Sequence, residues 1–218
     1  MSRIAIIGGH GKIALQAAKL LTGDGHQVSS VIRNPGQSDD ITATGATPIV
    51  LDIEKASTED IVEALDGHDA IVFSAGAGGG NPDRTYAVDR DAAMRSIDAA
   101  SAASIRRFVL VSYFGASTDH GVDPDDSFYA YAEAKGDADQ YLRASDLDWT
   151  IVAPSTLSDD EGAGTITTKE QGAERGTKVA RADVAAVITA VLESPGSVGR
   201  MIEFTAGDTP IADAVAGA

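Results

Sequence analysis

Two side chains that can move a proton together lie four residues apart. Tyr131 and Lys135 form a Tyr-x-x-x-Lys pattern inside a segment with helical periodicity. Residues i and i+4 of a helix share a face, so the phenol and the ammonium become neighbours. A nearby positive charge is expected to lower the pKa of the Tyr131 phenol. We interpret the pair as an acid–base group acting on a substrate oxygen, with a surface tyrosine beside a solvated lysine as the alternative.

A hydroxyl group follows the apolar run 108–111. Ser112 is expected at the carboxyl end of a strand, the edge where open parallel sheets bind ligands. We predict that Ser112 hydrogen-bonds a substrate oxygen. It could instead satisfy local backbone, and Tyr113, Ser117 or Thr118 could take the role.

Other catalytic patterns are missing from the sequence. There is no cysteine, and the four histidines show no ligand spacing with carboxylates, so no metal site is predicted. A Gly-x-Ser-x-Gly nucleophile elbow and a Gly-x-x-x-x-Gly-Lys-Ser/Thr phosphate loop are also absent.

The start of the chain indicates the ligand that accompanies this chemistry. The apolar run Ile4–Ile7 leads directly into a glycine-rich turn and then into helical spacing. Strand, glycine-rich turn and helix form the opening of a dinucleotide-binding unit, in which the helix start faces the phosphates. A plain turn without a ligand is the alternative. The residues predicted to contact the dinucleotide here are Gly8, Gly9, His10, Gly11, Lys12 and Ile13.

The end of the next apolar run indicates which dinucleotide is bound. Residues 27–32 are followed by Arg33, with no carboxylate at the strand end. An acidic residue there binds the ribose 2′-OH of NAD, whereas a basic one accommodates the 2′-phosphate of NADP. Arg33 therefore favours NADP over NAD. Asp39 and Asp40 are near enough in the sequence to compete for it.

Strand and helix patterns alternate along the whole chain. The strands read as continuous apolar runs, which is typical of a parallel sheet covered on both faces. We predict the α/β class: a doubly wound parallel sheet (Rossmann) with a small C-terminal substrate lobe. The chain is predicted to be one domain, 1–218, with the lobe segments mainly within 155–218. Further strands are expected at 48–51, 69–74, 108–112, 149–152 and 201–204. Helices are expected at 57–65, 85–101, 131–142 and 183–192, the last capped by Asp183. We also expect a second glycine-rich loop at 75–80 and an irregular segment with a short strand at 158–176.

Composition restricts the partners. The chain has 218 residues, 43% of them hydrophobic, and a net charge of −16. A field of this sign repels nucleic acid and anionic membranes. No apolar run approaches the roughly 20 residues of a membrane helix, and no signal leader is recognised. We predict a cytoplasmic protein, monomer or homodimer, that acts on a small molecule.

These residues support a resemblance to a known family. The chain resembles the atypical and extended short-chain dehydrogenases/reductases, and is most similar to small NmrA-like members named NAD-dependent epimerase/dehydratase. The resemblance covers nearly the whole chain: the glycine loop, the fifth strand 108–112, Tyr131–Lys135 and the sixth strand 147–154. It implies that Tyr131, Lys135 and Ser112 are catalytic, with Lys135 also holding the ribose. It further implies cofactor contacts from Asp52, Ile53, Ser74, Ala75, Gly76 and Pro154.

The chain departs from the family at two positions. Ala153 stands where an arginine commonly precedes the proline, and Phe114 stands where extended members place the catalytic serine or threonine. The resemblance implies an NADP-dependent oxidoreductase acting on a small carbonyl or alcohol. The alternatives are a non-catalytic NADP(H) sensor that acts through a protein partner, and an epimerase or isomerase that retains its cofactor.

Overall fold

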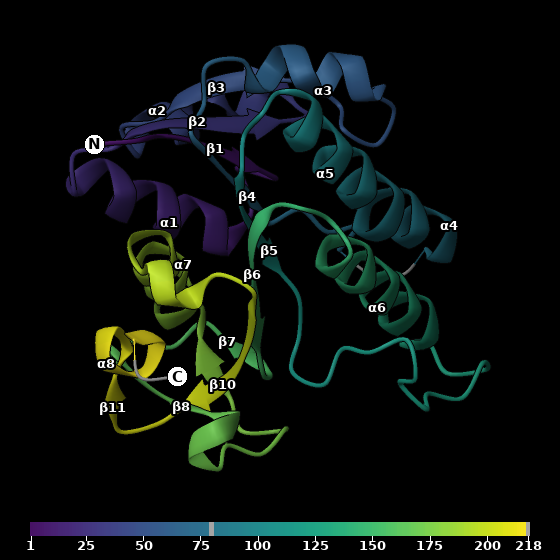
Figure 1. The fold of residues 1–218 in the computed structure, drawn as a ribbon, viewed down its shortest axis with the longest axis vertical. Coiled ribbons are helices and arrows are strands. Elements are labelled where there is room, and N and C mark those ends of the chain that lie inside the picture. The colour runs from purple at the N-terminus through teal and green to yellow at the C-terminus, as the bar shows by residue number, and fades with distance from the viewer. Residues whose placement is uncertain (79–80, 217–218) are drawn as a thin grey trace.

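A central sheet organises the molecule. The computed structural model describes residues 1–78 and 81–216. Across these residues the strands join in the order β11-β8-β10-β6-β5-β4-β1-β2-β3 (Figure 1). The strands of the parallel part are β1 (Arg3–Ile7), β2 (Gln27–Ile32), β3 (Thr47–Val50), β4 (Ala70–Phe73), β5 (Arg107–Val111), β6 (Asp148–Pro154) and β10 (Arg200–Ala206). Strand order reverses between β1 and β4, which creates the crevice used by ligands of doubly wound sheets.

The C-terminal part adds antiparallel pairing to this sheet. β8 (Thr165–Thr168) pairs antiparallel with both β10 and β11 (Thr209–Pro210). β7 (Leu157–Ser158) and β9 (Val179–Ala180) form a separate short parallel pair. The predicted doubly wound α/β class is therefore confirmed, with a small mixed C-terminal part.

Helices cover both faces of the sheet. Side chains along each strand alternate between two buried clusters. One is packed against the helices at 12–23 and 181–193, and the other against those at 58–65, 93–102 and 129–143. Figure 1 shows these two groups on opposite sides of the strands. The helices are α1 (Lys12–Gly23), α2 (Ser38–Ala43), α3 (Thr58–Leu65), α4 (Pro82–Thr85), α5 (Ala93–Ala102), α6 (Tyr129–Arg143), α7 (Arg181–Glu193) and α8 (Ile211–Ala216).

One helical stretch departs from the regular pattern that the sequence predicts. The expected helix at 85–101 is present, but its first half, Tyr86–Ala92 (η2), is a π-helix that runs between α4 and α5. Hydrophobic spacing does not reveal this change, because a π-turn adds one residue without removing the apolar face.

The start of α7 corrects another expectation. Ala180, not Asp183, is the N-cap residue. Asp183 lies buried in the first helical turn, where its carboxylate accepts hydrogen bonds from the backbone N–H groups of Ala163 and Gly164. The residue therefore fixes the loop before β8 rather than the helix end. Of the predicted glycine-rich loop 75–80, Gly79 and Gly80 lie outside the described residues.

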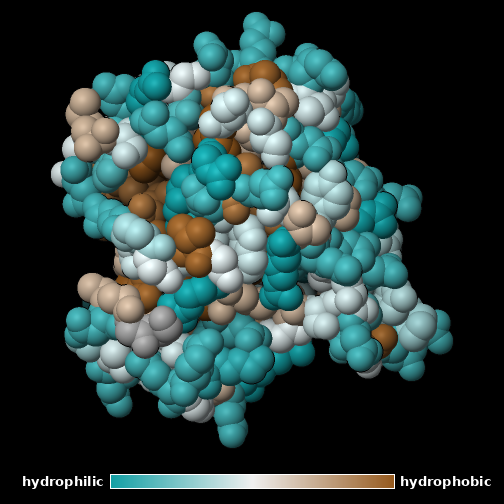
Figure 2. All heavy atoms as spheres, in the orientation of Figure 1, coloured by the Kyte–Doolittle hydropathy of each residue, from teal (hydrophilic) through white to brown (hydrophobic). Residues whose placement is uncertain are grey.

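The surface exposes polar and apolar side chains side by side (Figure 2). The face drawn in Figure 2 is mainly hydrophilic, and apolar atoms show between polar side chains. In the described part of the chain, no helix combines the length and apolar character needed to cross a membrane.

Candidate cofactor and active site

The glycine loop is shaped by two close backbone approaches. Gly8 has φ +82°, and a Cβ on it would lie 2.5 Å from the Cα of Ala75. A Cβ on Gly9 would lie 2.5 Å from the Cβ of Ser30. Both glycines donate backbone hydrogen bonds to Val31 O at the end of β2. The loop therefore fits only residues without a side chain, and it leaves the first N–H groups of α1 without intrahelical partners.

A cavity of about 360 Å³ adjoins this loop. It is lined by most of the residues that the sequence predicts for the cofactor, and these residues follow the ends of four strands, β1, β2, β3 and β4. Those lining it are Gly8, His10, Gly11, Arg33, Asp52, Ile53, Ser74, Ala75 and Gly76. Asp52 Oδ1 is buried and has no hydrogen-bond partner among the described residues. The glycine cradle and this unpaired acceptor fit an adenosine diphosphate moiety, which brings N–H donors and needs close backbone approach.

Arg33 lies at the rim of the cavity, but its ion-pair partner was not predicted. Its Nη1 is 3.3 Å from Glu54 Oε2, and Arg84 Nε also contacts Glu54 Oε2, at 3.0 Å. Neither Asp39 nor Asp40 pairs with Arg33 in the described chain. Glu54 follows β3. Its acidic side chain is all in the sequence that could have indicated this ion pair with Arg33. The guanidinium side chain is 54% exposed and can turn toward a ligand.

The two other polar side chains of the loop are engaged elsewhere. His10 Nε2 lies 2.8 Å from Asp40 Oδ2, and its Nδ1 lies 2.9 Å from Gln37 Nε2. Lys12 Nζ donates to Asp159 Oδ2 at 2.7 Å, pointing toward the C-terminal part. Both remain predicted cofactor contacts, and the backbone around them carries the strongest geometric support.

Tyr131 and Lys135 lie on the inner face of α6. Lys135 is 3% exposed; its Nζ donates to Val111 O at 3.1 Å and lies 3.3 Å from Asp89 Oδ1. The ammonium is 5.8 Å from the centre of the Tyr131 ring. Burial opposes the charge on Lys135, but attraction by Asp89, Tyr131 and Asp139 leaves its pKa raised. Lys135 is thus held as a cation.

The Lys135 ammonium does not lower the pKa of Tyr131 below its ordinary value, because burial and two carboxylates raise it more. Burial raises the pKa of the Tyr131 phenol, Lys135 lowers it, and the carboxylates of Asp89 and Asp139 raise it again, so the pKa is above its ordinary value. The lowered pKa expected from the ammonium together with a positive nicotinamide ring is not produced by the ammonium alone, because desolvation exceeds the attraction of an ammonium that a carboxylate already neutralises.

Asp89 is a site residue that sequence reasoning missed. It belongs to the π-helical segment and is 1% exposed. Its Oδ2 accepts a hydrogen bond from the backbone N–H of Ala77 at 2.9 Å, while Oδ1 faces Lys135. One carboxylate therefore fixes both the loop after β4 and the lysine. The sequence could have indicated Asp89 as an acidic residue that lies between apolar positions of a predicted helix.

Ser112 is also engaged differently from expectation. Its Oγ donates to Asp139 Oδ2 at 2.8 Å, and both residues are buried. Burial, partly offset by Ser112, Lys135 and Arg143, raises the pKa of Asp139 to about 6. The Ser112 proton is thus directed to a carboxylate, although Ser112 still lines the open space beside Tyr131. Asp139, like Asp89, was not predicted.

Two connected groups of lining residues define the space around Tyr131. A hollow of about 470 Å³ brings together Ile13, residues 74–76, Ser112, Tyr131, Lys135 and Pro154. A smaller one of about 230 Å³ is lined by Ser112, Tyr113, Phe114, Phe128, Tyr131, Pro154, Ser155, Thr156, Leu157 and Arg175. Ser112, Tyr131 and Pro154 line both. The predicted cofactor and catalytic residues therefore meet at one sheet edge.

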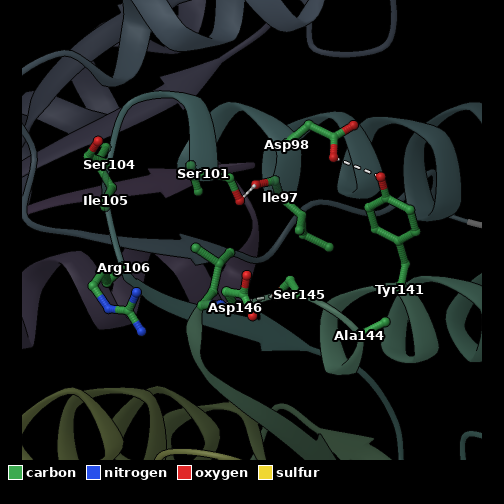
Figure 3. Close-up of a pocket in the computed structure, with 12 residues that line it drawn as sticks. Ile97, Asp98, Ser101, Ser104, Ile105, Arg106, Tyr141, Ala144, Ser145 and Asp146 are labelled. Atoms are coloured by element: carbon green, nitrogen blue, oxygen red, sulfur yellow. Dashed lines mark hydrogen bonds between the residues drawn. The ribbon is translucent and has the colours of Figure 1, made fainter.

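A larger hollow, of about 650 Å³, lies away from this edge. It opens between α5 and α6, next to the residues that precede β5 and β6 (Figure 3). Asp98 and Tyr141 face each other across it, with the phenol donating at 2.7 Å. Arg106 is paired with Asp148. Because ligands of such sheets bind at the carboxyl ends of the strands, this hollow is not part of the candidate site.

The fold and the site together define a dinucleotide-binding α/β protein. The comparisons with known proteins agree: the model of the NAD(P)H-binding family matches residues 8–195. The chain belongs to this family of atypical short-chain dehydrogenase/reductase and NmrA-like proteins, and it is an NAD(P)-binding protein of oxidoreductase or epimerase type.

Individual relatives extend over the full length. The sugar epimerase YhfK of Bacillus subtilis, named as uncharacterized, is 35% identical over 215 residues, covering 98% of each chain. A Bacillus halodurans structure with the provisional name NAD-dependent epimerase/dehydratase is 32% identical, with a TM-score of 0.92 and full coverage of both chains. The oxidoreductase ylbE of Lactococcus lactis is 26% identical with a TM-score of 0.87, covering 99% of this chain and 95% of that one.

Proposed function

We propose that the protein is an NADP-dependent oxidoreductase that reduces a small carbonyl compound or, in reverse, oxidises the alcohol. The observation that carries this proposal is the shared hollow in which Tyr131 and Lys135 face the glycine-loop residue Ile13 and the loop after β4. A proton donor thus stands where the reactive end of a dinucleotide is expected when its phosphates lie at the start of α1.

Different residues would hold different parts of the cofactor. The glycine loop and the start of α1 would hold the pyrophosphate, Asp52 and Ile53 the adenine, and Arg33 the 2′-phosphate. When bound, the nicotinamide supplies or accepts a hydride. Arg33 must leave Glu54 to meet a phosphate, and Arg84 remains to hold Glu54 when it does.

The chain's own part in the reduction is a proton transfer. As the carbonyl carbon gains a hydride, Tyr131 Oη–H donates its proton to the carbonyl oxygen, giving the alcohol and a tyrosinate. The Lys135 ammonium stabilises that negative charge, and a proton from solvent restores the phenol. Because the pKa of Tyr131 is raised, the residue is protonated at neutral pH, which is the form this direction needs.

Replacing Tyr131 tests the proposal directly. With 4-formylbenzoate, 4-formylbenzamide and short aldehydes as substrates, Tyr131→Phe is expected to slow NADPH oxidation at least about a hundredfold. NADPH affinity by calorimetry should stay within about twofold. Tyr129→Phe is the control, since the Tyr129 hydroxyl contacts Glu133, outside the hollow. Unchanged turnover in Tyr131→Phe would contradict the proposal.

Two observations favour a second function, a dinucleotide sensor that acts through a protein partner. The Ser112 hydroxyl donates to Asp139 rather than toward the open space, and Phe114 occupies the alternative serine position. Equal affinity for NADP and NADPH with no turnover of the carbonyl panel would support the sensor, and clear turnover would exclude it.

An epimerase or isomerase is suggested by the names of two relatives. Such an enzyme retains its cofactor between turnovers. Nucleotide released only on denaturing the purified protein would favour it, whereas protein purified free of nucleotide would favour the reductase. In either case the net charge of −16 supports a small-molecule substrate rather than nucleic acid or a membrane surface.

A further inference from the structure

The smaller hollow beside Tyr131 has an unusual electrostatic character for this chain. Of the described residues that line it, one carries a charge, Arg175, and none is a carboxylate. The protein as a whole has a net charge of −16. A lining with a cation and no carboxylate therefore contrasts with the acidic character of the protein as a whole.

Arg175 is positioned by aromatic rings rather than by a counter-ion. Its guanidinium carbon lies 5.4 Å from the centre of the Tyr113 ring and 5.7 Å from that of Phe128. These rings also pack on each other and on Tyr131, with centroids 5.3–5.5 Å apart. No salt bridge to Arg175 is found in residues 1–78 and 81–216. Stacking on a ring leaves the guanidinium N–H groups available to a ligand.

The segment that carries Arg175 is attached to the wall of the cavity. Gly176 N–H donates to Ser155 Oγ at 3.0 Å, and Val179 N–H donates to Thr156 O at 2.8 Å. Ser155 and Thr156 themselves line the hollow. In Figure 1 this part of the chain runs beyond β8, near the end of β10. Arg175 is therefore held at the cavity mouth by backbone contacts on its C-terminal side.

The charges of the segment are balanced once its ion pairs are counted, and Arg175 is its one charged residue that lines the hollow. Residues 169–181 contain four basic and two acidic residues, a net charge of +2. Lys169 and Arg181 are paired with Glu203 and Asp159, so their charge is largely compensated. Arg175 remains as the cation directed at the hollow. A planar guanidinium matches a carboxylate, which it binds through two parallel hydrogen bonds.

We propose that Arg175 binds a carboxylate of the substrate, so that the substrate class is small, flat carbonyl compounds carrying a carboxylate group. The inference rests on the proposed function in placing the carbonyl at Tyr131. The volume of about 230 Å³ is below the roughly 300–1,000 Å³ of sites for drug-sized ligands. The three aromatic rings favour a flat body between the carbonyl and the carboxylate.

A matched pair of probes tests the carboxylate. 4-Formylbenzoate and 4-formylbenzamide have nearly the same shape and differ in charge. Titrated calorimetrically into the NADP-saturated protein, the acid should bind about tenfold more tightly than the amide or better. Arg175→Gln should reduce this preference to below about twofold. Lys178→Gln, which removes the same charge from the same segment but lies outside the lining, should keep it.

The outcomes separate this inference from the proposed function. Equal affinity of the wild type for the two probes, no measurable affinity for either, or an unchanged preference in Arg175→Gln, overturns the role of Arg175. Binding that depends on Arg175 without NADPH oxidation supports this inference while contradicting the reductase. Reduction of both aldehydes with equal KM supports the reductase while overturning the inference. Thermal melts identify any variant that has failed to fold, and Arg175→Lys, which keeps the charge, should retain part of the preference.

Discussion

At the glycine loop the wall of the site is backbone, whereas around Tyr131 it is a set of side chains from several distant segments. Gly8 and Gly9 approach Ala75 and Ser30 so closely that any Cβ collides with them. The space beside Tyr131 is lined instead from the loop after β5, from α6, from the end of β6 and from the segment of Arg175. A site formed by backbone suits a ligand that stays the same, such as the cofactor. Where side chains form the site, substituting them can change which substrate binds.

The largest effect should come from filling the backbone wall. Gly8→Ala places a Cβ 2.5 Å from Ala75 Cα at φ +82°, so the loop must move. NADPH binding, measured by calorimetry, should weaken at least about a hundredfold. Gly25→Ala is the matched control, because Gly25 has φ +85° but open space around its Cβ position. If Gly8→Ala binds NADPH as well as Gly25→Ala does, the close approach is not what shapes the site.

An effect on stability rather than on binding should come from Asp139, the buried carboxylate near Tyr131. The pKa of Asp139 is raised from 3.8 to about 6. Between these values the folded state holds a proton that the unfolded state has lost, so stability falls as pH rises from about 4 to about 6, and the penalty stays above pH 6.

Asp139→Asn removes this titration. Its free energy of unfolding relative to wild type should rise by up to about 3 kcal/mol between pH 4 and pH 7, measured by urea denaturation. Asp137→Asn, on a more exposed part of the same helix, is the control and should show little of this trend. A constant difference across the pH range would mean that Asp139 is not held protonated by burial.

The smallest effect should come from Arg33, at the rim of the cavity beside the glycine loop. Arg33→Ala is expected to weaken NADP binding about tenfold and NAD binding less than about twofold, because the guanidinium addresses the 2′-phosphate alone. Glu54→Gln should act in the opposite direction and tighten NADP modestly, since it frees Arg33 from its ion pair. Equal losses of NADP and NAD in Arg33→Ala would refute the NADP preference.

The two halves also differ in how well the sequence predicts them. The order of strands and helices and the glycine loop follow from local patterns, because consecutive residues build them. The cavity residues Asp52 and Ser74 were expected only from the resemblance to the family. The pairing of Arg33 with Glu54 does not follow, since it joins the ends of two neighbouring strands. For the same reason the sequence could not show that Glu54, rather than Asp39 or Asp40, pairs with Arg33.

Around Tyr131, the sequence shows the residue types but not the surroundings that the fold gives them. Tyr131 and Lys135 share a helix face as their spacing predicts, yet the direction of the Tyr131 pKa shift depends on burial and on two carboxylates, Asp89 in the π-helical segment and Asp139 further along α6. Arg175 lies far along the chain from the rings it covers. Such contacts depend on tertiary packing, which local periodicity does not encode.

The π-helical segment Tyr86–Ala92 has a consequence for how this family can vary in length. Each residue of a regular helix turns the chain by about 100°. Deleting one residue from this segment would restore the regular helix, but it would rotate everything on its N-terminal side relative to α5. Asp89 would then no longer reach both Ala77 and Lys135. A substitution in this segment changes single contacts, whereas a one-residue deletion rotates every side chain on its N-terminal side relative to α5.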